Sequence, residues 1–198
     1  PTSGRVLLFG VPADRFTDWH RVGYVPQRTQ ATESRFPASV REVVNFGSYS
    51  GFDPFAMFKR KKSSERVDEA MELAGVRKLA DRRVSDISIG QQQRMLIARS
   101  LVRRPDLLVM DEPVAGIDAA GEEQFHSMIR RLNRDLGITI VMVSHDIGAV
   151  VREATTIACI NTDIVFHGPV HQLDAQALSN LYGFPVDVLM HDPEHTHR

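Results

Sequence analysis

The chain contains 198 residues, of which 42% are hydrophobic and 25% charged, and its 24 Lys and Arg nearly balance 25 Asp and Glu to a formal net charge of −1. This composition is typical of one globular domain with a packed core, and it argues against a strongly basic nucleic-acid binder or an acidic tail protein. The single cysteine, Cys159, excludes a disulfide framework and a cysteine-based zinc finger. No apolar run approaches the roughly 18 residues of a membrane span, and no signal peptide is visible, so we expect a cytoplasmic protein.

Helical periodicity dominates the chain from about residue 36 to residue 104, and only short β-type runs precede it. Those runs cover residues 5–9, with a turn at Gly10, and residues 22–25, ended by Pro26. Capping residues and apolar spacing predict helices from Ser39 to about Asn45, over 64–74 up to Gly75, and over 91–103 before Pro105.

Strands and helices alternate in the second half of the chain. Continuous apolar runs predict two strands that are buried on both faces, over 106–110 and 138–143. Helices are predicted over 119–136 and 146–152, and two further strands over 155–160 and 163–167 around a turn at Asn161 and Thr162. This alternation predicts an α/β sheet with helices packed on it, interrupted by a helical insertion near residues 36–100.

The strongest local motif is LLVMDEP, in which an apolar strand ends in the adjacent carboxylates Asp111 and Glu112. The carboxyl end of a parallel strand lies at the ligand edge of such a sheet. An Asp there helps to hold Mg²⁺ in nucleotide hydrolases, and a second acid beside it can act as a general base on the attacking water. A strand followed by a solvated acidic turn is the alternative interpretation.

Two further polar segments lie at the ends of predicted elements, one after a strand and one at the start of a helix. His145 follows the strand over 138–143, so its imidazole is predicted at the same edge, where it can bond a phosphate oxygen or orient a water, although a lone His is more often structural. Ser88 opens the helix that contains Gln91, and a helix N-terminus is a natural anion site. An ordinary N-cap with solvated Gln side chains would give the same pattern.

Together, five motifs resemble those of the ATP-binding subunits of ABC transporters, in that family's order and spacing. The segments are ISIGQ (87–91) for the signature LSGGQ, LLVMDEP (107–113) for the Walker B strand, GID (116–118) for the D-loop, VSHD (143–146) for the switch histidine and GYVPQR (23–28) for the Q-loop. The resemblance covers essentially the whole chain. It implies an α/β fold with an ABC-type P-loop NTPase core, a mostly parallel sheet with flanking helices, and an inserted helical subdomain.

The resemblance also implies how the chain is divided. An ABC nucleotide-binding domain, incomplete at its N-terminus, would cover residues 1–198. Its α/β core would consist of 1–35 and 105–170, its helical subdomain with the signature motif of 36–104, and its C-terminal helix and His-containing tail of 171–198. That tail carries His191, His195 and His197, which either bind a metal weakly or have no role.

Four residues would act on the nucleotide bound to this chain if the resemblance holds. Glu112 would position and activate water, and His145 would contact the γ-phosphate. Asp111 and Gln27 would contribute to holding the Mg²⁺ of MgATP, and Gln27 would also link the site to the membrane subunit.

Another four would act across a head-to-tail dimer. Ser88, Gly90 and Gln91 would contact the γ-phosphate bound on the opposite subunit, and Asp118 would line the dimer interface. Ile89 departs from the family pattern, because it stands where the signature has its first Gly. Since a β-branched side chain restricts the backbone and adds bulk near the phosphate, we expect weakened activity across the dimer.

The function implied is that of an ATP-hydrolysing motor subunit of an ABC transporter, with ATP and Mg²⁺ as cofactors. Its partners would be a second copy, an integral membrane permease and, indirectly, an extracytoplasmic metal-binding protein, with no nucleic acid; it would lie on the inner face of the plasma membrane. GYVPQR, FPASVREVV (36–44) and the segment 89–108 resemble the zinc and manganese uptake branch. Either metal is compatible with these motifs.

The phosphate-binding loop GxxxxGK[ST] is absent from this sequence, because none of the 13 glycines precedes a Lys. That loop cradles the phosphates and its Ser or Thr holds Mg²⁺. PTSGRVLLFG resembles the family's segment shortly after the loop, so we expect a chain that lacks its first few tens of residues and is inactive alone. The alternatives are a non-catalytic paralogue that docks on a permease, or a soluble DNA-repair ATPase, which the absence of a long coiled coil or zinc insertion disfavours.

Overall fold

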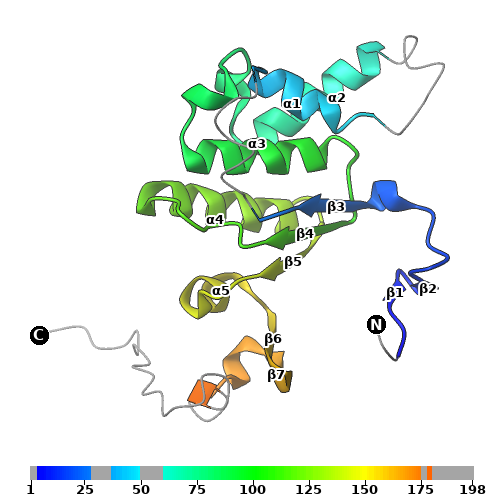
Figure 1. The fold of residues 1–198 in the computed structure, drawn as a ribbon, viewed down its shortest axis with the longest axis vertical. Coiled ribbons are helices and arrows are strands. Elements are labelled where there is room, and N and C mark those ends of the chain that lie inside the picture. Colours follow the sequence, from blue (N-terminus) through cyan, green and yellow to red (C-terminus); the bar gives the residue numbers. More distant parts are fainter. Residues whose placement is uncertain (1–3, 28–36, 50–59, 175–177, 180–198) are drawn as a thin grey trace, which may run out of the picture. The chain divides into compact units, whose positions relative to one another are not determined.

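The computed structural model describes residues 4–27, 37–49, 60–174 and 178–179 (Figure 1). It divides into two compact units, Pro1–His145 and Asp146–Arg198. The histidines of the predicted tail and most of the predicted loop over 48–58 lie outside these described ranges. Within the ranges, no helix is both long enough and apolar enough to cross a bilayer.

A three-stranded parallel sheet forms the centre of the first unit. Its strands are β3 (Val22–Val25), β4 (Leu107–Asp111) and β5 (Thr139–Val143), in the order β3-β4-β5. Two of the pairs that set the register are Val25 with Met110 and Asp111 with Val143. The predicted α/β fold is therefore confirmed, and β4 lies between the other two strands.

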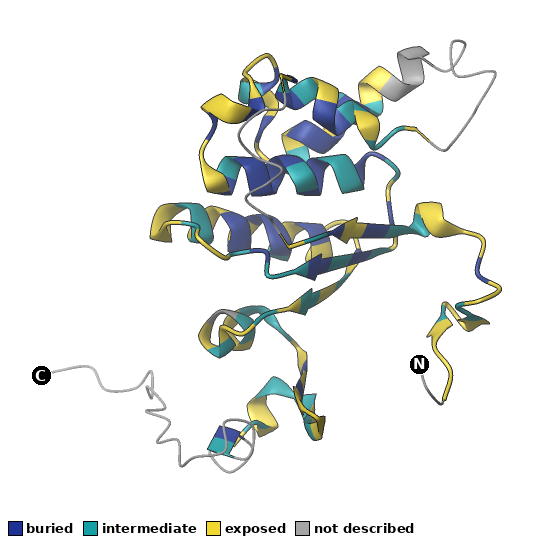
Figure 2. Ribbon diagram, in the orientation of Figure 1, coloured by how far each residue is buried: buried dark blue, intermediate teal, exposed yellow. Residues whose placement is uncertain are grey.

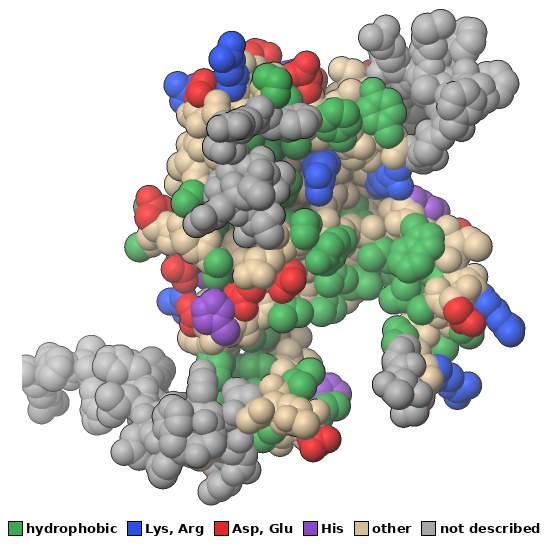
Figure 3. Space-filling model, in the orientation of Figure 1, with side chains coloured by type: hydrophobic (Ala, Val, Ile, Leu, Met, Phe, Trp, Pro, Cys, Tyr) green, Lys and Arg blue, Asp and Glu red, His purple; other side chains and the backbone are tan. Residues whose placement is uncertain are grey.

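The prediction that the two apolar strands are buried on both faces is wrong. Burial alternates along β4, where Leu108 and Met110 are fully buried and their neighbours only partly, and β5 exposes Val141 and Val143. Residues of α3 and α4 pack in one cluster with Leu108 and Met110, and Figure 2 shows buried residues in dark blue along both helices. In the space-filling view, hydrophobic side chains gather over the middle of the surface that Figure 3 presents.

The predicted helical insertion is present as a layer of three mutually packed helices. They are α1 (Val40–Phe46), α2 (Arg60–Leu73) and α3 (Ile89–Leu101). Ser39 caps α1 through a capping box with Glu42, and two hydrogen bonds from Ser39 hold the pKa of the Glu42 carboxyl below its usual value. Helix α2 begins before residue 64, where the sequence predicted its start. The apolar side chains of the predicted helix over 64–74 face the core, as expected from their spacing. The chain leaves the helix at Gly75, whose φ is 67°.

Helix α4 (Ala119–Arg134) connects β4 to β5 and supplies the other half of the core. Phe125, Ile129 and Leu132 on α4 are buried in one cluster with Ile97 of α3 and Leu108 of β4. This cluster fixes α3 and α4 on the same side of the sheet. Four short 3₁₀ helices are also described: η1 (Trp19–Arg21), η3 (Arg77–Leu79), η4 (Val84–Asp86) and η5 (Val170–Gln172).

Two small hairpins complete the described elements. In the first unit, β1 (Leu7–Leu8) pairs with β2 (Val11–Pro12) through a turn at Phe9 and Gly10, so the run predicted over 5–9 forms only two strand residues. The second unit contains α5 (Ile147–Glu153) followed by the hairpin of β6 (Thr156–Asn161) and β7 (Asp163–Pro169), as predicted. Cys159 is buried in that hairpin, and burial raises the pKa of its thiol.

The close approach of α1 to α3 yields a stability prediction at Gly47. Its backbone is helical, with a φ of −61°, which any residue adopts, but a Cβ added there would lie 2.0 Å from the carbonyl oxygen of Arg99. Because a backbone atom cannot move aside as a side-chain end can, Gly47→Ala should lower the free energy of unfolding by about 1–3 kcal/mol. Urea unfolding measures the loss.

The control for this substitution is Gly75→Asn. Gly75 has a positive φ and no atom within 4 Å of an added Cβ, and Asn is accepted at such a helix end. Its unfolding midpoint should stay near that of the unchanged protein. An equal loss at both positions would show that the Arg99 contact is not the cause.

Candidate functional site

Parallel pairing brings the ends of β4 and β5 to one edge of the sheet. Asp111 is the last residue of β4 and pairs with Val143, the last of β5. The ladder continues one step further, because the backbone N–H of Glu112 donates to the Val143 carbonyl oxygen at 2.9 Å. The acidic pair and the segment that follows β5 are therefore held side by side, as predicted.

Glu112 and His145 are in direct contact at this edge. The backbone N–H of His145 donates to Glu112 Oε1 at 3.0 Å, and His145 Nδ1 lies 2.8 Å from Glu112 Oε2. The Glu112 side chain is only 14% exposed, whereas that of His145 is 81% exposed. The carboxylate is thus held inside the edge, and most of the imidazole surface is exposed to solvent.

The backbone at Glu112 is unusual, with a φ of 47° for a residue that is not glycine. A side chain in this region costs of order 1 kcal/mol or more and persists only where its surroundings fix it. Here the Val143 ladder bond and the His145 contacts fix it. The left-handed turn ends the strand and turns the Glu112 side chain towards His145.

Asp111 and Gln27 are the two predicted Mg²⁺ contacts. Asp111 is half-buried, and Gln27 is exposed two residues past Val25, whose strand partner is Met110. Gln27 therefore follows the end of β3, at the same edge of the sheet as the residues that follow β4. A carboxylate and an amide oxygen are suitable donors for Mg²⁺, which keeps waters and takes its other ligands from phosphates.

These donors do not form a preformed metal cage. Among the described residues, no cluster of three or more His, Cys, Asp or Glu side chains could hold a metal ion by itself.

A second group of predicted residues meets at the start of α3. Ser88 Oγ accepts from the backbone N–H of Gln91 at 3.3 Å, and Gln91 Oε1 accepts from the Ser88 N–H at 3.0 Å, which is a complete capping box. The ordinary N-cap, which the sequence left as an alternative, is therefore present. Ile89 is the first residue of the helix, and its side chain is 44% exposed at this end of α3.

Asp118 caps α4 and lies next to this group. Its Oδ1 accepts from the backbone N–H of Gly121 at 2.8 Å. A Cβ added at Gly90 would lie 3.2 Å from Ile117 Cγ2 and 3.9 Å from Gly121 Cα, so the first turn of α3 contacts both sides of Asp118. The structure thus brings Ser88, Gly90, Gln91 and Asp118 to one junction between α3 and α4.

One charged residue at this junction was not singled out from the sequence. Arg94 lies one turn after Gly90 on the buried stripe that also includes Ala98 and Leu101, and it is only 8% exposed. The signal for it is its position, since four-residue spacing puts it on the apolar face of α3.

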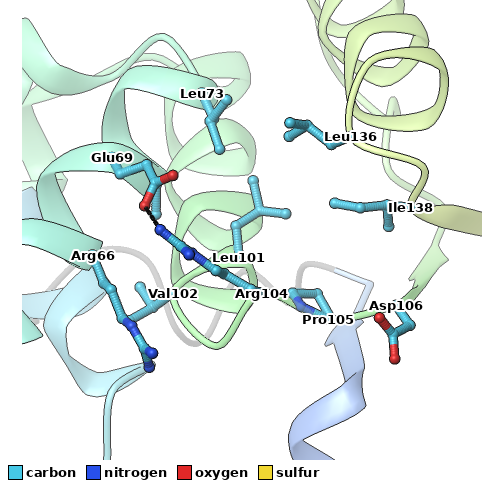
Figure 4. Close-up of a pocket in the computed structure, with 11 residues that line it drawn as sticks. Arg66, Glu69, Leu73, Leu101, Val102, Arg104, Pro105, Asp106, Leu136 and Ile138 are labelled. Carbon is cyan, nitrogen blue, oxygen red and sulfur yellow. Dashed lines mark hydrogen bonds and ion pairs between the residues drawn. The ribbon is translucent and has the colours of Figure 1, made fainter.

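A pocket lies at the opposite edge of the sheet. Figure 4 shows Leu73, Leu101, Leu136 and Ile138 around a cavity of about 350 Å³ bordered by the ion pair of Arg104 with its carboxylate partner Glu69. Ile138 directly precedes β5, whereas His145 follows it. This cavity is therefore separate from the Asp111, Glu112 and His145 edge.

Known proteins are similar to this chain in both sequence and fold. Residues 1–115 match the family described as ABC transporter. The chain is 37% identical over 169 residues to the zinc uptake system ATP-binding protein ZurA of Listeria monocytogenes, which covers 85% of this chain and 65% of that protein. It is 37% identical over 147 residues to the zinc import ATP-binding protein ZnuC of Paramagnetospirillum magneticum, covering 74% and 52%.

Comparison with solved structures gives the same family as the sequence comparison. The structure of cbiO1 from Clostridium perfringens, part of the ABC transporter complex cbiONQ, matches with a TM-score of 0.72 at 29% identity, over 87% of this chain and 68% of that one. The chain spans 65% and 52% of the lengths of the two curated relatives.

The capping box at the start of α3 can be tested by its effect on stability. Ser88→Ala removes the side chain that accepts from the Gln91 N–H, so the free energy of unfolding should fall by about 1 kcal/mol. Ser85→Ala is the control, because Ser85 is exposed and, among the described residues, its hydroxyl bonds only its neighbour Asp86. The melting temperatures of both variants are compared in thermal unfolding. Equal melting temperatures for the two variants would contradict a capping role for Ser88.

Proposed function

Because this chain belongs to the ABC transporter family, we propose that it is part of the ATP-hydrolysing motor subunit of a metal-ion transporter. The observation that carries this proposal is the contact of Glu112 with His145 beside Asp111, at the carboxyl edge of a parallel sheet. Such an edge is where open α/β sheets bind their ligands.

Each residue at this edge has a separate role in the proposed hydrolysis of ATP. Glu112 accepts a proton from the attacking water, and His145 donates a hydrogen bond to a phosphate oxygen. Asp111 and Gln27 contribute oxygen donors to Mg²⁺, which when bound neutralises charge on the phosphates. Since both Glu112 oxygens are engaged by His145, the carboxylate must release at least one of these contacts before it can orient a water.

The second group of residues acts on the nucleotide of a partner subunit. Ser88, Gly90 and Gln91 would approach the γ-phosphate bound there, at the positive end of the α3 dipole, and Asp118 would lie at the interface. Their reciprocal capping bonds would then be exchanged for bonds to phosphate. This part of the proposal requires a head-to-tail homodimer.

The proposed assembly is a homodimer docked on an integral membrane permease at the cytoplasmic face of the membrane, with an extracytoplasmic metal-binding protein as an indirect partner. The names of the relatives, zinc uptake and zinc import ATP-binding proteins, favour zinc as cargo, with manganese as the alternative. Residues 36–104 would form the helical subdomain, 1–35 and 105–170 the core, and 171–198 the C-terminal helix and tail.

Replacing Glu112 tests the proposed catalytic role in the full-length protein. Glu112→Gln keeps the size of the side chain but removes the base, so ATP turnover should fall by about 10²–10⁴-fold while ATP affinity is retained. A phosphate-release assay measures turnover, and calorimetry measures binding.

The matched control is Glu123→Gln, because Glu123 is 75% exposed on α4 and pairs only with Arg130 within the ranges that the structure describes; it should leave turnover unchanged. Full turnover in Glu112→Gln would contradict the assignment. ATP binding without turnover in the unchanged protein would instead favour a non-catalytic docking subunit.

The exposed Ile89 side chain provides a separate prediction. Because it projects from the end of α3 that would face the phosphate, Ile89→Gly in the full-length protein should increase turnover several-fold, at a helix-propensity cost of about 1 kcal/mol. Ile89→Ala removes the bulk without loosening the backbone, so a similar increase would assign the effect to side-chain size. Unchanged turnover in both variants would show that Ile89 is tolerated.

A further inference from the structure

We propose that Gln92 is a positioning residue that fixes the peptide unit between Ile87 and Ser88, so that the Ser88 N–H is held ready for a phosphate oxygen on the partner subunit. This inference rests on the proposed function, in which Ser88, Gly90 and Gln91 approach that phosphate. Gln92 itself would contact neither nucleotide, because its side chain is only 8% exposed and its amide group faces the segment before α3.

The Gln92 side chain makes two buried hydrogen bonds to one short segment. Its Nε2 donates to the carbonyl oxygen of Val84 at 3.0 Å and to that of Ile87 at 3.0 Å. This nitrogen carries two hydrogens, so one is available for each carbonyl. A residue near the start of α3 therefore holds the chain that leads into the same helix.

The peptide unit between Ile87 and Ser88 connects these bonds to the proposed phosphate contact. In a trans peptide unit, the C=O and N–H groups are coplanar and point in opposite directions. Because the Ile87 C=O faces Gln92, the Ser88 N–H faces away from it, and it donates to Gln91 Oε1 at 3.0 Å. A hydrogen bond to the carbonyl also polarises the unit, which strengthens its N–H as a donor.

Opening of the capping box gives this orientation its use. In the proposed function, Ser88 and Gln91 exchange their reciprocal bonds for bonds to phosphate, which removes Gln91 Oε1 from the Ser88 N–H. The two Gln92 bonds involve neither capping group, so they persist when the box opens. The Ser88 N–H then keeps its direction and is free to donate to a phosphate oxygen.

The segment that Gln92 holds is also fixed at its other end. The Val84 N–H donates to the carbonyl oxygen of Ala38 at 3.0 Å, and the first N–H of α1 donates to that of Arg82 at 2.9 Å. These backbone bonds attach the segment to the start of α1. Loss of the Gln92 bonds would therefore act at the end of the segment next to Ser88.

Gln93 is a matched control on the same helix. It is the next residue and is only 4% exposed, but its Nε2 makes no hydrogen bond to any described residue. Replacing either Gln by Met removes the amide and keeps a side chain of similar length. Only the replacement at Gln92 removes the bonds to Val84 and Ile87.

Turnover and ATP affinity of the full-length protein test the inference. Gln92→Met should lower kcat about tenfold, because displacing a group by about 1 Å can cost up to about 100-fold in rate. ATP affinity, measured by calorimetry, should change less than twofold, since other residues would hold this chain's own nucleotide. Gln93→Met should leave kcat unchanged, and Gln92→Lys, which keeps a donor for the two carbonyls, should retain most of the turnover.

Mixed dimers show on which subunit Gln92 acts. A dimer of one Gln92→Met subunit and one Glu112→Gln subunit has one site in which an intact Glu112 faces intact residues 88–91. Turnover of the mixture should therefore exceed that of either variant alone. A general defect of the Gln92→Met subunit would impair the Glu112 of that same subunit, and mixing would give no gain.

Gln91→Glu is the reference for such a gain, because it places a carboxylate against the partner's phosphate. A gain with Gln91→Glu but none with Gln92→Met overturns the inference and leaves the proposed function standing. Unchanged kcat in Gln92→Met, or an equal loss in Gln93→Met, also overturns it.

Two other results are decided in advance. No turnover in the unchanged protein, or no gain with Gln91→Glu, overturns the proposed head-to-tail motor and the inference with it. Should Gln92→Met fail to fold, Gln92→Asn is measured in the same two ways, because its amide is one methylene too short to reach both carbonyls. A loss of kcat that mixing restores supports the inference, and full turnover contradicts it.

Discussion

Parallel pairing of β4 with its two neighbours is the constraint on which the candidate site depends. Strands that run in the same direction end at the same edge, so the residues that follow them are brought together regardless of their distance along the chain. The register sets which residues meet: Asp111 pairs with Val143, and the Glu112 N–H continues that ladder. His145 can contact Glu112 only because this last bond brings the turns after β4 and β5 together.

Packing on one side of the sheet sets the position of the second group. The cluster that joins Ile97, Phe125 and Leu108 holds α3 and α4 over the same face. Both helix N-termini then lie at one junction, where Gly90 contacts the residues on either side of Asp118. The apolar core thus determines where the polar residues at the two helix ends lie, although it contains none of them.

Much of this arrangement could be predicted from the sequence, because local signals specify it. The order of strands and helices, the cap at Ser88 and the edge position of His145 follow from apolar periodicity, capping residues and the rule that parallel strands share an edge. Roles for the individual residues came from a family resemblance.

Other features depend on tertiary contacts and left no clear local signal. A continuous apolar run such as ITIVMV does not reveal whether one face of its strand or both are covered, and Val141 and Val143 prove exposed. The left-handed backbone of Glu112 depends on Val143 and His145, which lie about 30 residues away. Arg94 gave no clear signal, because a charged residue normally indicates the solvent-exposed face of a helix. Its position in α3 instead places it on the buried face of that helix.

Paramagnetic broadening of methyl signals tests most directly whether the nucleotide binds at the carboxyl edge of the sheet. Mn²⁺ would replace Mg²⁺ in a titration of the full-length protein with ATP, with Met110 and Met142 as probes near that edge and Ile138 as the probe at the opposite cavity. Broadening that is strong at both methionines and weaker at Ile138 is the predicted result. Stronger broadening at Ile138, or none at either methionine with ATP bound, would contradict the account.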